Sequence, residues 1–297
     1  MTGSAYITPS VGDEVIETFC SMHPESLDTG LYLFFDELQE MQNWGAWLRR
    51  IVDTTKATIY VTGSSSKMLY KRNFHRNFED RALDFELLPF SFREFVRARG
   101  IAESELLSRN EAAGYSTKER LMLSAALISY LEEGGFPAIE GLPTPQRVTL
   151  LQSYVQRVVS RDVVERYDIA RPRVASALAR RLLGSNGKPL SIRKMENELR
   201  SAGLATSRVL LGDLLEYFED AYLVFRMKDF SMSLKESTTS TSKIYAIDPG
   251  LAAASSMASA RDDGQRLENA VYLELRRRTA GYTSRRHIVM PYQGTWL

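Results

Sequence analysis

The feature that constrains the fold most is an unbroken apolar run, Leu31–Phe35, which is followed directly by two acids, Asp36 and Glu37. Because the run does not alternate, it predicts a strand buried on both faces, as in a parallel sheet covered by helices. Apolar residues then recur with helical spacing over 44–51, and a second strand-like run covers Thr58–Thr62. A strand, a helix and a strand at this spacing indicate a βαβ unit.

The two acids stand at the carboxyl end of a predicted strand, where open α/β sheets bind their ligands. The pattern is that of a Walker B motif, in which Asp36 would hold hydrated Mg²⁺ and Glu37 would polarise the water that attacks a γ-phosphate. Thr62 and Ser64 follow the second strand, and their hydroxyl groups could contact the γ-phosphate or that water. The alternatives are a solvated strand end and an ordinary Gly-Ser loop.

Composition narrows the class of protein. The 297 residues carry 38 basic and 37 acidic side chains, a net charge of +1, so the total charge indicates no particular partner. A single cysteine cannot form a disulfide framework, which is typical of a reducing compartment. The sequence shows no signal-peptide pattern and no apolar run long enough to cross a bilayer. We therefore expect a cytoplasmic globular protein without a membrane partner.

The second half of the chain is mainly helical in pattern. Ser116 with Glu119 predicts a helix start, and the glycine pair at 134–135 predicts its end. Over 171–247, two helices joined by a turn and followed by two strands indicate a winged helix-turn-helix.

A basic block covers the predicted winged helix, with nine basic and two acidic residues over Arg171–Arg208. Such a block can supply phosphate contacts to DNA. The candidate DNA-binding residues are Arg193, Lys194, Arg200 and Arg208. The alternatives are a solvated helix face and a winged helix that binds a protein.

Several motifs occur in order along the chain: Phe35–Gln39, Thr62–Ser66, Leu87–Phe95, Glu133–Pro137, Arg161–Asp162 and Leu267–Leu275. Together they resemble the prokaryotic AAA+ ATPases of the archaeal-ATPase-like group. The resemblance implies a P-loop-type parallel sheet, ATP and Mg²⁺ as ligands, and a C-terminal region containing a winged helix and a restriction-endonuclease-like part.

The resemblance also implies roles for single residues. Asp36 and Glu37 match the Walker B acids, and Ser64, or less closely Thr62, matches the sensor 1 position that contacts the nucleotide. Arg81 matches an arginine that usually follows a glycine in the family, although Asp80 stands at the glycine position here.

A Walker A loop, Gly-x4-Gly-Lys-Ser/Thr, does not occur in the sequence, and Gly187-Lys188 is followed by Pro189. We therefore expect a fragment truncated at both ends. Its predicted parts are a partial AAA+ core over 1–98, a helical lid over 99–170, a winged-helix-like domain over 171–247 and an incomplete restriction-endonuclease-like region over 248–297. Two hypotheses stay open: an ATPase fragment that is inactive alone, and a non-catalytic module that binds DNA or a protein.

Overall fold

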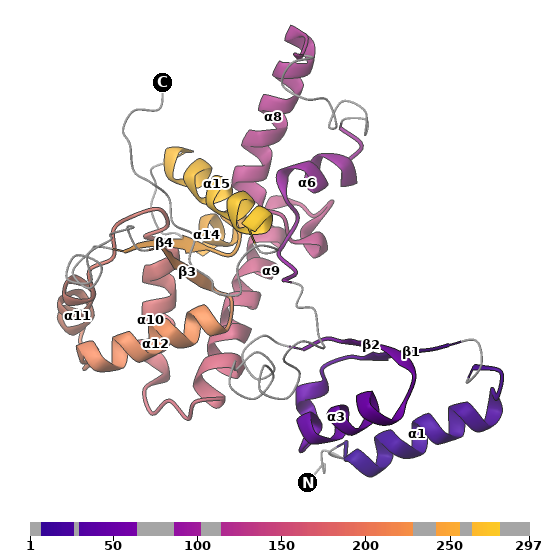
Figure 1. Ribbon diagram of the computed structural model, residues 1–297. Helices are drawn as coiled ribbons and strands as arrows, with labels where there is room; N and C mark the ends of the chain where they lie inside the picture. The colour runs from indigo at the N-terminus through magenta and orange to yellow at the C-terminus, as the bar shows by residue number, and fades with distance from the viewer. Residues whose placement is uncertain are drawn as a thin grey trace, which may run out of the picture. The chain divides into compact units, whose positions relative to one another are not determined.

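A computed structural model describes residues 7–26, 30–63, 86–101, 114–227, 242–255 and 263–279. The chain divides into two compact units, residues 1–84 (unit 1) and residues 85–297 (unit 2), and each is described by itself. The described residues form a mixed α/β structure that is mostly helical, with two small sheets (Figure 1). No helix within these ranges is both long and apolar enough to cross a bilayer.

Unit 1 contains the predicted strand, helix and strand. β1 and β2 pair in parallel, from Leu31 opposite Ala57 to Phe35 opposite Val61. Parallel pairing requires a crossover connection, and α3 supplies it. The described elements of unit 1 are α1 (Pro9–Met22), β1 (Leu31–Phe35), the 3-10 turn η1 (Leu38–Glu40), α3 (Trp44–Thr54) and β2 (Ala57–Val61).

Helices α1 and α3 are held together by one polar cluster. The Asp13 carboxylate accepts hydrogen bonds from Trp47 Nε1 at 2.8 Å and from Arg50 Nη2 at 2.6 Å. Gly12 lies against the Trp47 indole, where a Cβ at residue 12 would come within 2.6 Å of the ring. These contacts place Trp47, Leu48 and Ile51 in the core of unit 1.

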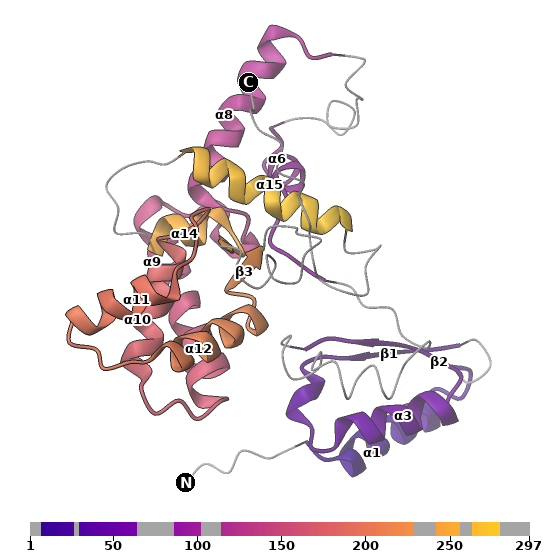
Figure 2. The same ribbon diagram turned by 60° about the vertical axis from the view of Figure 1, so that its left-hand side comes forward.

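The prediction that the first strand is buried on both faces is wrong. Helices α1 and α3 both lie on the same side of the β1–β2 sheet (Figures 1 and 2). On the other face, Tyr32, Phe34 and Tyr60 are 64%, 72% and 50% exposed. Phe34 and Tyr60 stack on each other there, with ring centroids 4.9 Å apart. The apolar run therefore has one covered face and one open aromatic face.

Unit 2 is built mainly of helices around one large core. The elements of its described part are α6 (Phe92–Ala98), α8 (Thr117–Glu133), the 3-10 turn η3 (Pro137–Ile139), α9 (Thr144–Arg157), the π-helix η4 (Val158–Glu165), α10 (Pro172–Leu183), α11 (Ile192–Ser201), α12 (Arg208–Asp220), β3 (Val224–Met227), β4 (Lys243–Ala246), α14 (Pro249–Ser255) and α15 (Asp263–Thr279).

The predicted start and end of α8 are confirmed by its caps. Ser116 and Glu119 form the capping box of α8, and Gly134 ends that helix. Ser191 and Ser207 cap α11 and α12 through their hydroxyl groups. β3 and β4 then pair antiparallel, as expected for the two strands after α12.

The core of unit 2 extends past the predicted domain limits, because residues from α9, α12, β4 and α15 share one apolar cluster. The limits at 98, 170 and 247 stay predictions.

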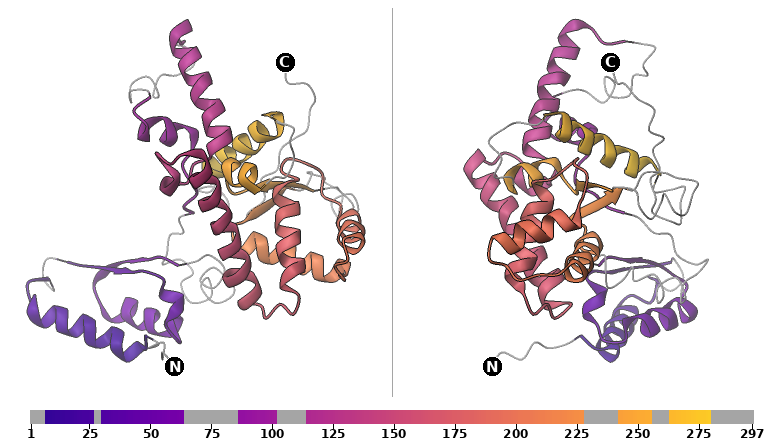
Figure 3. Two further views of the ribbon diagram at one scale, coloured as in Figure 1. Left: turned by 180° about the vertical axis from the view of Figure 1, so that it is seen from behind. Right: turned by 90° about the vertical axis from the view of Figure 1, so that its left-hand side faces the viewer.

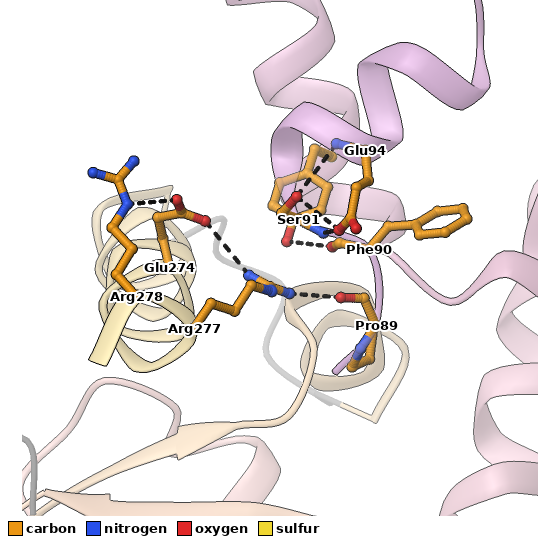
Figure 4. Close-up of polar contacts among 8 residues, drawn as sticks. Pro89, Phe90, Ser91, Glu94, Glu274, Arg277 and Arg278 are labelled. Atoms are coloured by element: carbon orange, nitrogen blue, oxygen red, sulfur yellow. Dashed lines mark hydrogen bonds and ion pairs between the residues drawn. The ribbon is translucent and has the colours of Figure 1, made fainter. Parts of the chain in front are cut away.

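The segment before α6 is fixed by backbone contacts. Phe90 N donates to Gly135 O at 2.7 Å, and Phe90 O accepts from the Tyr130 hydroxyl. Arg277 of α15 donates to Pro89 O at 2.6 Å, and Ser91 with Glu94 forms the capping box of α6 (Figure 4). The Leu87–Phe95 motif thus ties α6 to α8 and α15.

Helices α8 and α14 meet at a buried acid, Asp248. Its carboxylate accepts from Gly135 N at 2.6 Å and from Leu251 N at 2.8 Å. Gly134 has a φ of +87°, and a Cβ there would collide with this carboxylate. Burial raises the pKa of Asp248 from its usual 3.8 to about 6.

The raised pKa of Asp248 predicts a pH-dependent stability. Between about pH 4 and 6 the folded chain binds more protons at this residue than the unfolded chain does, so the free energy of unfolding falls as pH rises. The expected loss is about 3 kcal/mol, and it is complete above the folded pKa. Urea unfolding across this range measures it.

Asp248→Asn should flatten this slope, because it removes the titrating group. The matched control is Asp13→Asn in unit 1. Hydrogen bonding from Arg50 holds the pKa of Asp13 below its usual value, so its contribution disappears only at lower pH. If the free energy of unfolding of Asp248→Asn depends on pH as strongly as that of the unchanged chain, the assignment of this pH dependence to Asp248 is wrong.

Candidate functional site

The candidate site lies where β1 and β2 end, at the carboxyl edge of the parallel sheet. Asp36 follows β1 directly and Thr62 follows β2 directly, so the parallel register brings the two residues side by side. The Thr62 hydroxyl donates a hydrogen bond to Asp36 Oδ1. The prediction that Asp36 and Glu37 stand at the tip of a parallel sheet is confirmed.

Glu37 is held in an uncommon backbone conformation. Its φ of 49° and ψ of 40° lie in the left-handed region, which non-glycine residues adopt at a cost of roughly 1–3 kcal/mol. Its backbone N–H lies 3.4 Å from Thr62 Oγ1, and Leu38 N donates to Thr62 O at 3.3 Å. Thr62 therefore contacts three consecutive residues, 36 to 38, through its side chain and its carbonyl oxygen.

The donor set at this edge suits a hard cation. The Asp36 and Glu37 carboxylates and the Thr62 hydroxyl are all exposed oxygen groups. Mg²⁺ prefers oxygen ligands and keeps several of its waters, so an open edge with one or two carboxylates is the kind of protein surface it uses. The residues present therefore fit a hydrated Mg²⁺ ion.

Two further predicted site residues, Ser64 and Arg81, lie outside the described residues. Their assignment as a sensor and as an arginine of the site stays a prediction. Sequence reasoning placed Ser64 ahead of Thr62 at the sensor position, and that order stays a prediction. Thr62 lies against Asp36. The sequence carried one signal for this: Thr62 and Asp36 each follow the last residue of a paired strand.

The basic block lies on α10, α11 and α12, and part of it is paired within the fold. The half-buried Arg181 forms a two-pronged salt bridge with Glu198 at 2.6 and 3.0 Å. Arg200 and Arg208 both reach the buried Glu196, at 2.9 and 3.3 Å. Of the four candidate DNA-binding side chains, Arg208 thus joins α12 to α11, and Arg200 pairs within α11.

The other two candidates, Arg193 and Lys194, lie exposed in the first turn of α11.

Helix α12 presents an acidic outer face. Leu211, Leu214, Leu215 and Phe218 are fully buried, and Asp213 and Glu216 are exposed on the opposite side beside Val209. Carboxylates on this face would repel the phosphates of a DNA groove.

Comparison with known proteins gives a family match that includes the residues at the carboxyl edge of the β1–β2 sheet. Residues 9–96 match an AAA domain. This match covers the whole of β1, α3 and β2, and therefore Asp36, Glu37 and Thr62. Residues 124–262 match a domain of unknown function (DUF8612), which covers most of the helical core of unit 2.

Three relatives match most of the chain. An uncharacterized protein of Methanocaldococcus jannaschii is 36% identical over 247 residues, which are 83% of this chain and 53% of that protein. An uncharacterized protein of Haemophilus influenzae is 24% identical over 254 residues, 85% of this chain and 59% of its own length. A second uncharacterized protein of Methanocaldococcus jannaschii is 24% identical over 270 residues, 85% of this chain and 55% of its own length. The chain spans somewhat more than half the length of these relatives.

Proposed function

We propose that the chain is part of an ATP-binding ATPase of the AAA type, and that Asp36, Glu37 and Thr62 form the magnesium and water side of its nucleotide site. The observation that carries the proposal is the cluster at the carboxyl edge of the β1–β2 sheet, within the residues that match an AAA domain. Ligands of open parallel sheets bind at this edge.

Each residue has a distinct role in this site. Asp36 would hold hydrated Mg²⁺, and the Thr62 hydroxyl fixes one of its carboxylate oxygens. Glu37 would orient and polarise the attacking water, because its exposed carboxylate is set by the left-handed turn at the strand end. Bound Mg²⁺ would neutralise charge on the β- and γ-phosphates. Ser64 and Arg81 complete the proposed set as γ-phosphate contacts.

The phosphates themselves need donors that this sequence does not contain. Asp36 and Glu37 are anions, and no Gly-x4-Gly-Lys-Ser/Thr loop occurs in the 297 residues. We therefore assign phosphate binding to polypeptide outside this sequence, and the greater length of the relatives is consistent with that assignment.

The test uses the longer Methanocaldococcus jannaschii relative, which is 36% identical to this chain. We expect that protein to hydrolyse ATP with Mg²⁺. Changing the acid that aligns with Glu37 to Gln should lower kcat by roughly 100-fold or more while ATP still binds, because the group acts on the water and not on the phosphates. Changing the residue that aligns with the exposed Glu40 is the control. Equal turnover in both variants would contradict the proposal.

A second candidate function is a non-catalytic winged-helix module. Helices α10, α11 and α12 are followed by the antiparallel strands β3 and β4, and a single bridge pairs Pro189 with Lys243 of β4. This order of elements supports the winged-helix prediction. The acidic face of α12 and the pairing of Arg200 and Arg208 favour a protein partner over DNA. Strongly salt-dependent binding of duplex DNA by this chain would favour the DNA alternative.

A further inference from the structure

Helix α8 has an apolar face that the described part of unit 2 leaves open. Residues 121–128 read Leu-Met-Leu-Ser-Ala-Ala-Leu-Ile, so this stretch is apolar nearly all round. Ala126 and Tyr130 are buried against Phe95 and Val96 of α6. On the other side, Leu121 is 68% exposed and Ile128 is 57% exposed. A helix that is apolar all round is normally buried on all sides.

The open face is one continuous stripe. Leu121, Ser124, Ala125 and Ile128 are all exposed and have the spacing i, i+3, i+4, i+7 of a single helix face. The N-terminal half of α8 extends beyond the elements of unit 2 that pack around its other end (Figures 1 and 3).

The stripe is symmetric about its own midpoint. Two small residues, Ser124 and Ala125, lie between two large ones, Leu121 and Ile128. A second copy of α8 running antiparallel would place its Ile128 opposite Leu121 and its Leu121 opposite Ile128. The small residues would then meet at the centre, where they allow the two helix backbones to come close. This is the self-complementary pattern that a two-fold interface needs.

The charged residues at the two ends of the stripe also favour an antiparallel pair of α8 helices. Lys118 lies about one turn before Leu121, and Glu132 lies about one turn after Ile128. In an antiparallel pair each Lys118 meets Glu132 of the second copy, whereas a parallel pair would set like charges against each other. The pattern of the helix itself therefore favours a second copy of this chain as the partner.

We propose that the chain forms a two-fold symmetric dimer through α8, with Leu121, Ser124, Ala125 and Ile128 as its apolar contact. The contact is small, so we expect a weak dimer, with a dissociation constant on the order of 10 μM. This inference does not depend on the proposed ATPase function.

Sedimentation equilibrium tests the dimer. The 33.7 kDa chain is expected to reach twice that mass as its concentration rises. Ile128→Lys should weaken the dimer by at least roughly thirtyfold, because it sets a charge in an apolar contact. Val209→Lys is the matched control, since Val209 is 73% exposed on α12 and should leave the dimer unchanged. A chain that stays monomeric to about 200 μM, or a dimer that survives Ile128→Lys, would overturn the proposal.

Cysteine cross-linking tests the antiparallel arrangement in a Cys20→Ser background. Ala125→Cys lies near the symmetry axis and should cross-link to itself on mild oxidation. Leu121→Cys should cross-link well only when mixed with Ile128→Cys. Charge exchange adds a third measurement: Lys118→Glu should weaken the dimer by roughly fivefold, and Glu132→Lys in the same chain should restore it. Efficient self-cross-linking of Leu121→Cys would exclude the antiparallel dimer.

Discussion

Titration of the 297-residue chain with ATP and Mg²⁺ is expected to give a dissociation constant weaker than about 1 mM. A phosphate-binding loop supplies several charge-assisted hydrogen bonds, each worth roughly 1.5–3 kcal/mol. Without about four of them, the affinity falls by at least about four powers of ten, at ~1.4 kcal/mol per power. The acids at the sheet edge cannot replace these donors, because they repel the phosphates unless a cation lies between.

Isothermal titration calorimetry measures this affinity, and the longer Methanocaldococcus jannaschii relative provides the reference. The relative should bind ATP at least about a thousandfold more tightly than the chain. Micromolar ATP binding by the chain alone would show that residues within this chain bind the phosphates of ATP. In that event the proposed division of the site between two stretches of polypeptide would be wrong.

Gly250→Ala is expected to destabilise unit 2 by about 3 kcal/mol or more. Gly250 lies in the first turn of α14, where the helix crosses the end of α8. An added Cβ would lie 2.6 Å from Gly134 N and would collide with the Glu133 carbonyl group, which is backbone and cannot rotate away. The two helices would have to separate, and that movement would break the hydrogen bond from Gly135 N to Asp248.

Gly212→Ala is the matched control for this substitution. Gly212 lies inside α12, and a Cβ added there would meet no atom from outside its own helix within 4 Å. Alanine at this position should stabilise the helix by about 0.5–1 kcal/mol, because it lowers the entropy of the unfolded chain. Urea unfolding monitored by far-ultraviolet circular dichroism measures both variants. If Gly250→Ala is no less stable than Gly212→Ala, the close approach of α8 and α14 is not as described.

Local patterns in the sequence determined most of the secondary structure. The apolar run at 31–35 became β1, and the serine at 116 became a helix cap. These signals work because strand periodicity and capping depend on residues only a few positions apart. The sequence also placed Asp36 and Glu37 at the carboxyl edge of a sheet, because residues that directly follow a strand lie at its carboxyl end.

Only the tertiary structure decided the contacts between distant segments. It left Tyr32 and Phe34 exposed because α1 and α3 cover the same face of the sheet. It joined Arg208 of α12 to Glu196 of α11, and it brought Thr62 to Asp36 across 26 residues. The glycine at 134 indicated only a helix end, yet the close approach of α8 and α14 is what requires glycine at 134 and 250. The spacing of apolar residues shows that a side chain packs against a neighbour. The identity of that neighbour depends on how the helices and strands pack together.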